Sequence, residues 1–324
     1  LSEIDSYSRF VPYAVMAGLK FAGVESRSSW DRMAVSTVFS NIAMAAAVYA
    51  AKGTVKEMRP DHSARNSFPS GHTAMAFTAA TIFHKEYGLT HSPWYSAGAY
   101  AVAAGTGVMR VLNNHHWAND VIAGAGIGIL SAELGYFVGD LLYRDKGICR
   151  REMQGCGDPD DPSFFDVQMG ISTHSSRINV EHDGMGPEDS YIRLGTSTSA
   201  GIETAYFLNK HVGIGGMARV TVTPVKDFDD SRFIDTSLDL GIYGNLPLCQ
   251  SVSLGTKALV GARLCSDMEN DILKVTRSNA INFVTGISGT WHHKENCAWK
   301  VFADIDSSKL MDFVTVGAAF SVCF

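Results

Sequence analysis

The chain has little of what several classes of protein require. Its 324 residues include only 9 prolines, and only 19% of them are charged. This composition excludes a disordered, collagen-like or coiled-coil chain. Acidic residues outnumber basic ones by 33 to 27, and the net charge of -6 argues against a nucleic-acid partner.

Long hydrophobic runs are also lacking. The mean hydropathy is +0.02, and the longest uncharged stretches, 33–51 and 87–109, are diluted by Ala, Ser, Thr, Asn or Gly. The sequence therefore does not predict a polytopic helical membrane protein. Hydropathy does not detect a transmembrane β-barrel, because the strands of such a barrel alternate between apolar and polar residues.

The six cysteines are even in number, which permits disulfides and suits an oxidising compartment. Cys149 and Cys156 are close enough in sequence for a disulfide to close a short loop, and unpaired thiols are the alternative. The first residue is Leu1. We expect a mature chain from which a targeting segment has been removed.

The two halves of the chain have different hydrophobic periods. Apolar residues recur every three or four positions in 9–21, 30–51, 73–87, 94–112 and 116–143, which predicts helices. From about residue 164 the period becomes two. In the last segment, for example, one face carries Val314, Val316, Ala318, Phe320, Val322 and Phe324. Eight such segments predict eight strands, most of them long enough to cross a bilayer.

The predicted strands are joined alternately by short and long connections. Connections 209–211, 247–250 and 293–296 are short, whereas 175–190 and 266–279 are long and polar. This half resembles the small eight-stranded outer-membrane proteins of Gram-negative bacteria, and the closing Phe324 resembles their C-terminal insertion signal. The alternative is a soluble sandwich or lipocalin-like barrel with its apolar face inside.

Three polar clusters stand out in the helical half. The first is Lys52 followed after six residues by Arg59-Pro60, and the second is Phe68-Pro69-Ser70-Gly71-His72. The third joins Arg110, His116 and Asp120. Together they resemble the signature of the type-2 phosphatidic acid phosphatase superfamily, over roughly residues 30–140. That superfamily includes lipid phosphate phosphatases, bacterial acid phosphatases and vanadium haloperoxidases. Met109 departs from the family pattern, which usually has a small residue there, and puts the local packing in doubt.

The chemistry of these residues agrees with the resemblance. A phosphoryl group in transfer spreads negative charge over three oxygens. Lys52, Arg59 and Arg110 supply three cations for it. Ser70 and Gly71 open a predicted helix, whose free N–H groups and dipole also favour an anion. Other polar residues of the same loop are further candidates for substrate contact, namely Asp61, His62, Arg65 and Asn66.

The resemblance implies two catalytic histidines. His116 is the expected nucleophile, because Asp120 lies four residues later on one helical face and can hold one ring nitrogen as N–H. His115 has Asn119 at that spacing, a weaker partner, and is not expected to act. His72 is the expected acid for the leaving oxygen and later the base for water. We expect no metal and no cofactor, and His292-His293 has no metal-binding pattern.

The sequence thus predicts an α+β multidomain protein. An all-α phosphatase bundle covers residues 1–145, a linker covers 146–163, and an eight-stranded antiparallel transmembrane β-barrel covers 164–324. The chain enters the barrel on the side of the short turns, which face the periplasm in outer-membrane barrels. We therefore expect the barrel in the bacterial outer membrane and the phosphatase domain in the periplasm.

The expected activity is metal-independent hydrolysis of phosphate monoesters through a phosphohistidine. The expected substrates are lipid phosphates such as lipid A, phosphatidylglycerol phosphate or phosphatidate, and outer-membrane lipids are the expected surroundings. The alternatives are a broad acid phosphatase for small phosphate esters, a polyprenyl diphosphate phosphatase and a haloperoxidase. A structural barrel with an inactive domain is the alternative that is not an enzyme.

Overall fold

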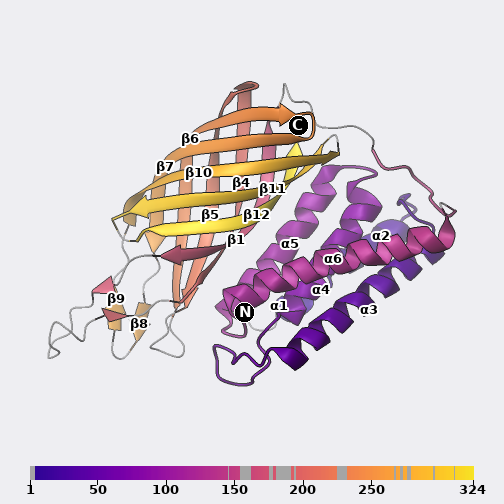
Figure 1. The fold of residues 1–324 in the computed structure, drawn as a ribbon, viewed down its shortest axis with the longest axis horizontal. Coiled ribbons are helices and arrows are strands. Elements are labelled where there is room, and N and C mark those ends of the chain that lie inside the picture. The colour runs from indigo at the N-terminus through magenta and orange to yellow at the C-terminus, as the bar shows by residue number, and fades with distance from the viewer. Residues whose placement is uncertain are drawn as a thin grey trace. The chain divides into compact units, whose positions relative to one another are not determined.

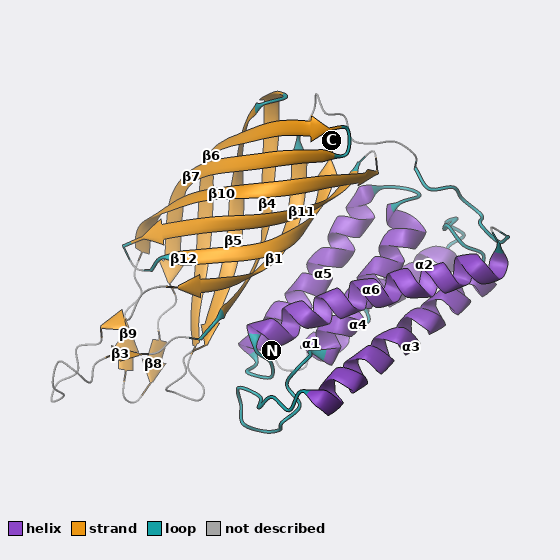
Figure 2. Ribbon diagram, viewed as in Figure 1, coloured by secondary structure: helices purple, strands orange, loops and turns teal. Residues whose placement is uncertain are grey.

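The computed structural model describes residues 4–144, 146–153, 162–174, 178–179, 191–192, 195–224, 232–265, 268–270, 273–275, 279–294, 296–309 and 311–324. The chain divides into two compact units, one helical and one built of strands (Figures 1 and 2). A helical domain followed by a closed antiparallel barrel of eight strands confirms the predicted fold class.

Six α-helices form the first unit. They are α1 (Ile4–Ser8), α2 (Val11–Phe21), α3 (Trp30–Thr54), α4 (Gly71–Phe83), α5 (Pro93–Leu112) and α6 (Ala118–Tyr143), and the π-helical turn η1 (His84–Gly88) follows α4. The five predicted helices are confirmed, with ends that differ by a few residues. The sequence did not predict α1, because its five residues are too short for a hydrophobic period.

Helix α4 begins where the Pro-Ser-Gly segment predicts. Ser70 is its N-cap, and its Oγ accepts hydrogen bonds from the Thr73 amide at 3.4 Å and the Thr73 hydroxyl at 2.9 Å. The backbone N–H of Ser70 donates to the Asp120 carbonyl at 2.9 Å. The N-terminus of α4 is therefore fixed to the first turn of α6.

Glycines allow α6 to pack tightly against two neighbouring helices. A Cβ on Gly124 would lie 2.6 Å from the Ser70 carbonyl oxygen, and one on Gly135 would lie 2.5 Å from the Ser40 amide nitrogen. Any larger side chain would push α6 away from α4 or α3. Close packing at these points sets the position of the residues at the start of α4 and α6.

Helices α3 and α6 are more apolar than the low hydropathy of the chain predicts. Both are long and apolar enough, by length and composition, to cross a membrane, and less than half of each apolar window is buried. Two such helices do not make a polytopic membrane protein, so that prediction from the mean hydropathy is not contradicted. The alanines and glycines of these helices lower the mean hydropathy but add no charge, so each helix keeps a long uncharged stretch.

Eight strands close the barrel in the order β1-β12-β11-β10-β7-β6-β5-β4 (Figure 1). Their bounds are β1 (Phe164–His174), β4 (Ser197–Asn209), β5 (Val212–Pro224), β6 (Arg232–Cys249), β7 (Val252–Cys265), β10 (Asn279–Lys294), β11 (Cys297–Ser308) and β12 (Phe313–Cys323). Two small hairpins lie outside the barrel, formed by β2 (Ile178–Asn179) with β3 (Tyr191–Ile192) and by β8 (Met268–Asn270) with β9 (Leu273–Val275).

The barrel has an apolar outer surface and a polar interior. Leu240, Val260 and Val316 are at least half exposed, whereas Arg219, Asp304 and other charged side chains of the opposite face are buried. The soluble sandwich or lipocalin-like barrel, whose apolar face would form the core, is therefore wrong for this chain. An exception is Phe320, which is buried because it packs against Trp299 on the neighbouring strand at a ring distance of 5.4 Å.

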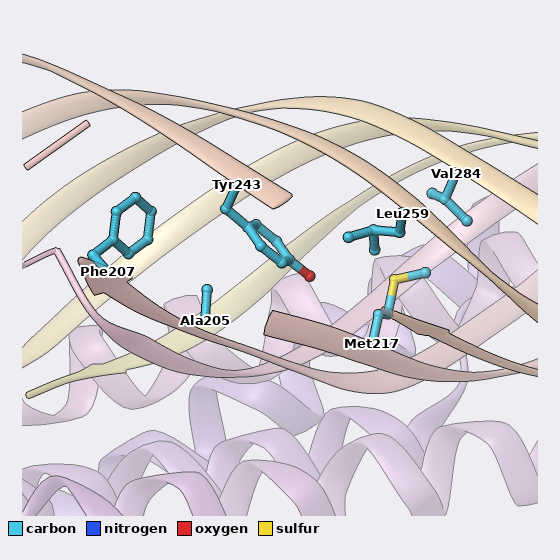
Figure 3. Packing of buried hydrophobic residues seen from close by; sticks show 6 residues of the cluster. All are labelled: Ala205, Phe207, Met217, Tyr243, Leu259 and Val284. Carbon is cyan, nitrogen blue, oxygen red and sulfur yellow. The ribbon is translucent and has the colours of Figure 1, made fainter. Parts of the chain in front are cut away.

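Two kinds of contact fill the interior. One is a small apolar cluster shown in Figure 3, formed by Ala205, Phe207, Met217, Tyr243, Leu259 and Val284. The other is a network of ion pairs. In that network Arg219 pairs with Asp304 and Asp306, and Lys257 pairs with Glu203 at 3.0 Å. The polar, Gly-rich face predicted for a narrow filled barrel is confirmed.

The predicted short turns are confirmed, since β4 and β5, β6 and β7, and β10 and β11 are each separated by two residues. The long connection 175–190 lies almost wholly outside the described residues. Of the two alternatives for Cys149, the structure has the unpaired thiol, and Cys156 lies outside the described residues. Cys249, Cys265 and Cys297 likewise form no disulfide.

Candidate active site

The predicted site residues all lie in the helical unit, at the ends of helices or in the loop after α3. Lys52 is in the last turn of α3 and Arg110 in the last turn of α5, while Gly71 and His72 open α4. Asp120 is in the first turn of α6, and Arg59 lies in the loop between α3 and α4. Helix ends and tight loops thus bring residues from three separate sequence clusters together.

His116 and Asp120 form a buried pair. The distance from His116 Nδ1 to Asp120 Oδ2 is 3.4 Å, and the two side chains are 3% and 0% exposed. The prediction that both lie on one helical face was wrong in detail, because His116 precedes α6, which begins at Ala118. Asp120 instead reaches back and accepts from the backbone N–H of Trp117 at 2.9 Å, as acidic residues in a first turn often do.

The Asp120 carboxylate has one further donor. The Ser67 hydroxyl donates to the same Oδ2, and the Ser67 amide donates to the Glu57 carbonyl at 3.0 Å. The Glu57 side chain lies close enough for burial and the negative charge of Asp120 to raise its pKa. Ser67 and Glu57 were not expected at the site, because neither belongs to the three sequence clusters.

Burial keeps the His116 ring neutral. It lowers the pKa of His116 below the usual 6.5, and the positive charges of Arg110 and Lys52 act in the same direction, although Asp120 opposes them. With Nδ1 facing Asp120, the other ring nitrogen, Nε2, is the one able to attack an electrophile.

The same physical causes act on His72 more strongly. Burial, followed by the charges of Arg110 and Arg9, lowers the pKa of His72 to about 4. The charge of Arg110 lowers the pKa of both predicted catalytic histidines, so the structure brings both of them close to Arg110. At pH 7 the His72 ring is neutral unless a nearby negative charge compensates its proton.

The predicted phosphate-binding cations are held by short contacts. Lys52 Nζ donates to the Asn66 carbonyl oxygen, and Arg59 Nε donates to the Asn66 side-chain oxygen at 2.9 Å. Asn66 was only a candidate for substrate contact in the sequence, and here it orients two of the three cations. Both of these cations are partly exposed, whereas Arg110 is buried.

Arg110 has an ionic partner that the sequence did not reveal. Its Nη1 lies 2.7 Å from Oδ2 of Asp5, whose side chain is fully buried. No local pattern identifies this contact, because Asp5 precedes Arg110 by 105 residues and lies outside the three clusters.

His115 also differs from its prediction. Its Nδ1 lies 3.1 Å from Oδ2 of Asp61, so Asp61, rather than Asn119, is its partner. Asp61 is itself held by the Ser63 amide and hydroxyl at 2.9 and 2.6 Å. Within the described parts of the chain, no group of three or more His, Cys, Asp or Glu side chains is placed to hold a metal ion.

Comparisons with known proteins find similar sequences and folds. One relative, the lipid A 1-phosphatase of Porphyromonas gingivalis, is 48% identical over 145 residues, which cover 44% of this chain and 32% of the relative. The chain thus spans about a third of the length of that relative.

Solved structures resemble each unit. Aquifex aeolicus LpxE covers 40% of this chain and 82% of its own length, with 23% identity and a TM-score of 0.32. The outer membrane protein OprG from Pseudomonas aeruginosa covers 53% of this chain and 99% of its own, with 11% identity and a TM-score of 0.38. Neisserial surface protein A covers 53% and 100%, with 12% identity and a TM-score of 0.34.

The sequence model of the PAP2 superfamily matches residues 33–140, the stretch that carries all three clusters. This part of the chain is therefore a PAP2 superfamily domain.

Proposed function

We propose that the chain is a phosphatase that removes phosphate from lipid phosphate monoesters without a metal ion. The observation that carries this proposal is the buried His116–Asp120 pair beside Arg110, in a domain of the PAP2 superfamily. The 48% identity to a lipid A 1-phosphatase supports a lipid phosphate as the substrate. Lipid A, phosphatidylglycerol phosphate and phosphatidate are the substrate candidates.

In the proposed reaction, Nε2 of His116 attacks phosphorus while Asp120 holds the Nδ1 proton. The P–N bond forms as the P–O bond to the leaving group breaks, and His72 gives its proton to the leaving oxygen. A water molecule then attacks the phosphohistidine. His72 takes a proton from this water, the P–N bond breaks, and inorganic phosphate leaves.

The three cations and the start of α4 stabilise the charge that moves during this reaction. Lys52, Arg59 and Arg110 bind the equatorial oxygens of the phosphoryl group, and backbone N–H groups near Gly71 add donors. Ser70 caps α4 with its hydroxyl, so we assign its phosphate contact to the same hydroxyl acting as a donor. The negative charge of bound phosphate raises the pKa of His72, which lets that ring carry the proton it must donate.

Apolar strips on α3 and α6 support a lipid substrate. These helices run antiparallel, since Gly135 faces Ser40 and Gly139 faces Ser36. Each exposes a row of large apolar side chains, which are Val38, Ile42 and Tyr49 on α3 and Leu130, Leu134, Phe137 and Leu141 on α6. We propose that these strips contact acyl chains.

The charges at the ends of these strips support a site at the level of the lipid headgroups. The uncharged part of α3, residues 33–51, is roughly 28 Å long at 1.5 Å per residue, close to the thickness of a hydrocarbon core. Arg32 pairs with Asp140 at one end. At the other end lie Lys52 and Asp120, two residues of the proposed site.

The barrel supports a location in the bacterial outer membrane. Its exposed apolar side chains suit lipid, and its interior charges are paired. Phe164, where the barrel begins, pairs with Ala205, close to the short turn after β4. We propose that these turns and the phosphatase domain, residues 1–145, face the periplasm, and that residues 146–163 are a tether.

The substrate is tested with the full chain folded in lipid vesicles. Lipid A, phosphatidylglycerol phosphate, phosphatidate, a polyprenyl diphosphate and a soluble aryl phosphate are compared by phosphate release, with His116→Ala as the inactive control. The proposal predicts that a lipid monoester has the highest kcat/KM. Preference for the aryl phosphate would instead favour a broad acid phosphatase. If no ester releases phosphate, the alternative that is not an enzyme, a structural barrel with an inactive domain, is favoured.

A further inference from the structure

Asp5 and Arg110 form a buried ion pair inside the proposed site. Asp5 lies on α1, outside residues 33–140 that match the superfamily. Its Oδ2 lies 2.7 Å from Arg110 Nη1, and the two side chains are 0% and 7% exposed. Burial alone would raise the pKa of the Asp5 carboxyl, but the pKa is lowered, first by the hydrogen bond and charge of Arg110 and then by a hydrogen bond from Asn113 and the charge of His72. The carboxylate therefore stays charged at neutral pH.

The pair occupies only one part of the guanidinium. A guanidinium can bind two oxygens of a phosphoryl group through its Nε–Nη2 edge. Asp5 takes Nη1, while Arg110 Nε is buried and has no hydrogen-bond partner among the described residues. An unpaired buried N–H of a cation is costly unless a ligand satisfies it.

We propose that Asp5 is a positioning residue that fixes Arg110 so that its Nε–Nη2 edge faces the oxygens of the transferring phosphoryl group. This inference rests on the proposed function of the site. With this role for Asp5, helix α1 contributes to a site whose proposed phosphate ligands all lie between Lys52 and Arg110 in the sequence. The side chain of Arg110 is long and rotatable, and a fixed partner lowers the entropy that it loses when phosphate binds.

Charge alone predicts the opposite effect of Asp5. A carboxylate close to the site repels a phosphate dianion, so removing Asp5 would strengthen anion binding if electrostatics were its only contribution. If Asp5 positions Arg110, its removal weakens binding of the transition state, because the guanidinium is no longer held in place. The two roles therefore predict changes of opposite sign in vanadate binding. Turnover depends in addition on His72, whose pKa the charge of Asp5 raises.

The test uses the full chain in lipid vesicles and the variants Asp5→Ala and Asp5→Asn. We expect Asp5→Ala to lower kcat and kcat/KM together by about 10²-fold, the size of effect typical of a misplaced catalytic group. Asp5→Asn keeps an oxygen acceptor for Nη1, so it should lower kcat and kcat/KM only about tenfold. Vanadate, which mimics the five-coordinate transition state, should inhibit Asp5→Ala more weakly than the wild type. Glu25→Gln, an exposed acid of the same unit, is the matched control and should have no effect.

A double-mutant cycle separates positioning from a general effect on the fold. In an Arg110→Ala background, Asp5→Ala should cause little further loss, because the group that it positions is already absent. Independent, multiplying losses would overturn the proposal. So would faster turnover or tighter vanadate binding in Asp5→Ala, since Asp5 would then obstruct the site.

Vanadate binding also distinguishes failure of this inference from failure of the proposed function. The shift in Tm caused by vanadate reports anion binding even if no ester is hydrolysed. If wild type shows no turnover but Asp5→Ala weakens this shift, the positioning of Arg110 stands and the proposed reaction falls. If Asp5→Ala does not fold, Asp5→Asn decides, and an Asn variant with unchanged kcat, vanadate inhibition and vanadate-induced shift would overturn the role of the charge.

Discussion

Nδ1 of His115 lies 3.1 Å from Asp61 Oδ2, so two consecutive histidines each have an aspartate partner. The two pairs differ in burial. The His115 side chain is 31% exposed, whereas that of His116 is 3% exposed and lies where the charges of Arg110 and Lys52 affect it. An aspartate partner alone therefore does not identify the nucleophile, and the surrounding cations are the distinguishing feature.

His116→Ala should abolish nearly all turnover, while His115→Ala should keep activity within about tenfold of wild type. The reason is that only His116 combines a free Nε2 with adjacent phosphate-binding cations. Phosphate release and trapping of an acid-labile phosphohistidine measure the two effects. Equal damage from the two substitutions would contradict the assignment.

The rate should fall on the acidic side of pH 6.5. His116 must be neutral to attack, and burial lowers its pKa below 6.5. Consequently the neutral fraction decreases only as pH falls through that lowered pKa, and kcat/KM, which reports the free enzyme, decreases with it. A pH–rate profile measures this, and an acidic limb centred above pH 7 would be inconsistent with a buried neutral nucleophile.

Anion binding should bring a proton to His72. Its pKa of about 4 makes the ring neutral at pH 5.5, and a bound dianion should raise that pKa and draw in up to about one proton. Sulfate is a suitable probe because it stays doubly charged at this pH. Calorimetry in two buffers of different ionisation enthalpy measures the uptake, which His72→Asn should abolish. The same uptake in both proteins would assign the proton to another group.

Chelation should leave activity unchanged, whereas vanadate should inhibit. The described residues offer cations and donors for an oxyanion but no cluster of metal ligands. Assays with and without EDTA, and a vanadate titration, measure the two effects. Activity that is lost in EDTA and restored by a divalent metal would refute the metal-free mechanism.

A charge on the outer barrel face should destabilise the protein in lipid. Val260 and Val316 are 50% and 58% exposed on this face, and Val260→Arg should cost about 2–4 kcal/mol if the position is near the bilayer midplane. Urea unfolding in vesicles measures the change, with Val260→Thr as the control. At Thr315, which is buried, Thr315→Arg should act by overpacking the interior, so its effect should persist in detergent micelles. If Val260→Arg leaves the free energy of unfolding unchanged, this face does not contact lipid.

Removing Arg219 from the ion-pair network inside the barrel should lower the free energy of unfolding. Arg219 pairs with Asp304 and with Asp306, at 3.0 Å from the latter, and all three are almost fully buried. Arg219→Met leaves Asp304 with only Lys257 at 3.0 Å and Asp306 with only Arg263 at 3.7 Å. The cost should therefore be below the roughly 3–5 kcal/mol of a buried charge that loses its only partner. The penalty should shrink when Asp304→Asn and Asp306→Asn are added. Equal penalties with and without the asparagines would show that the pairing itself does not hold the strands.

The sequence by itself determined the fold class and most of the proposed site. The period-two alternation from Phe164 onward and the helical period before it are local patterns. The five long helices and the eight barrel strands therefore form close to where these patterns predict. The same holds for Ser70 and Gly71 at the start of α4, because capping depends on a few adjacent residues. Seven polar residues at defined spacings were enough to indicate the phosphate site.

Only the tertiary structure decided which side chains meet. The Asp5–Arg110 and His115–Asp61 contacts join residues 105 and 54 positions apart, and no period or short motif encodes such pairs. The barrel faces show the same limit, because alternation alone does not tell which face points inward. Ion pairing decides that point, since Asp304 and Arg219 come from strands that are not adjacent. They neutralise each other only across the interior of a closed barrel, where a buried charge requires a partner.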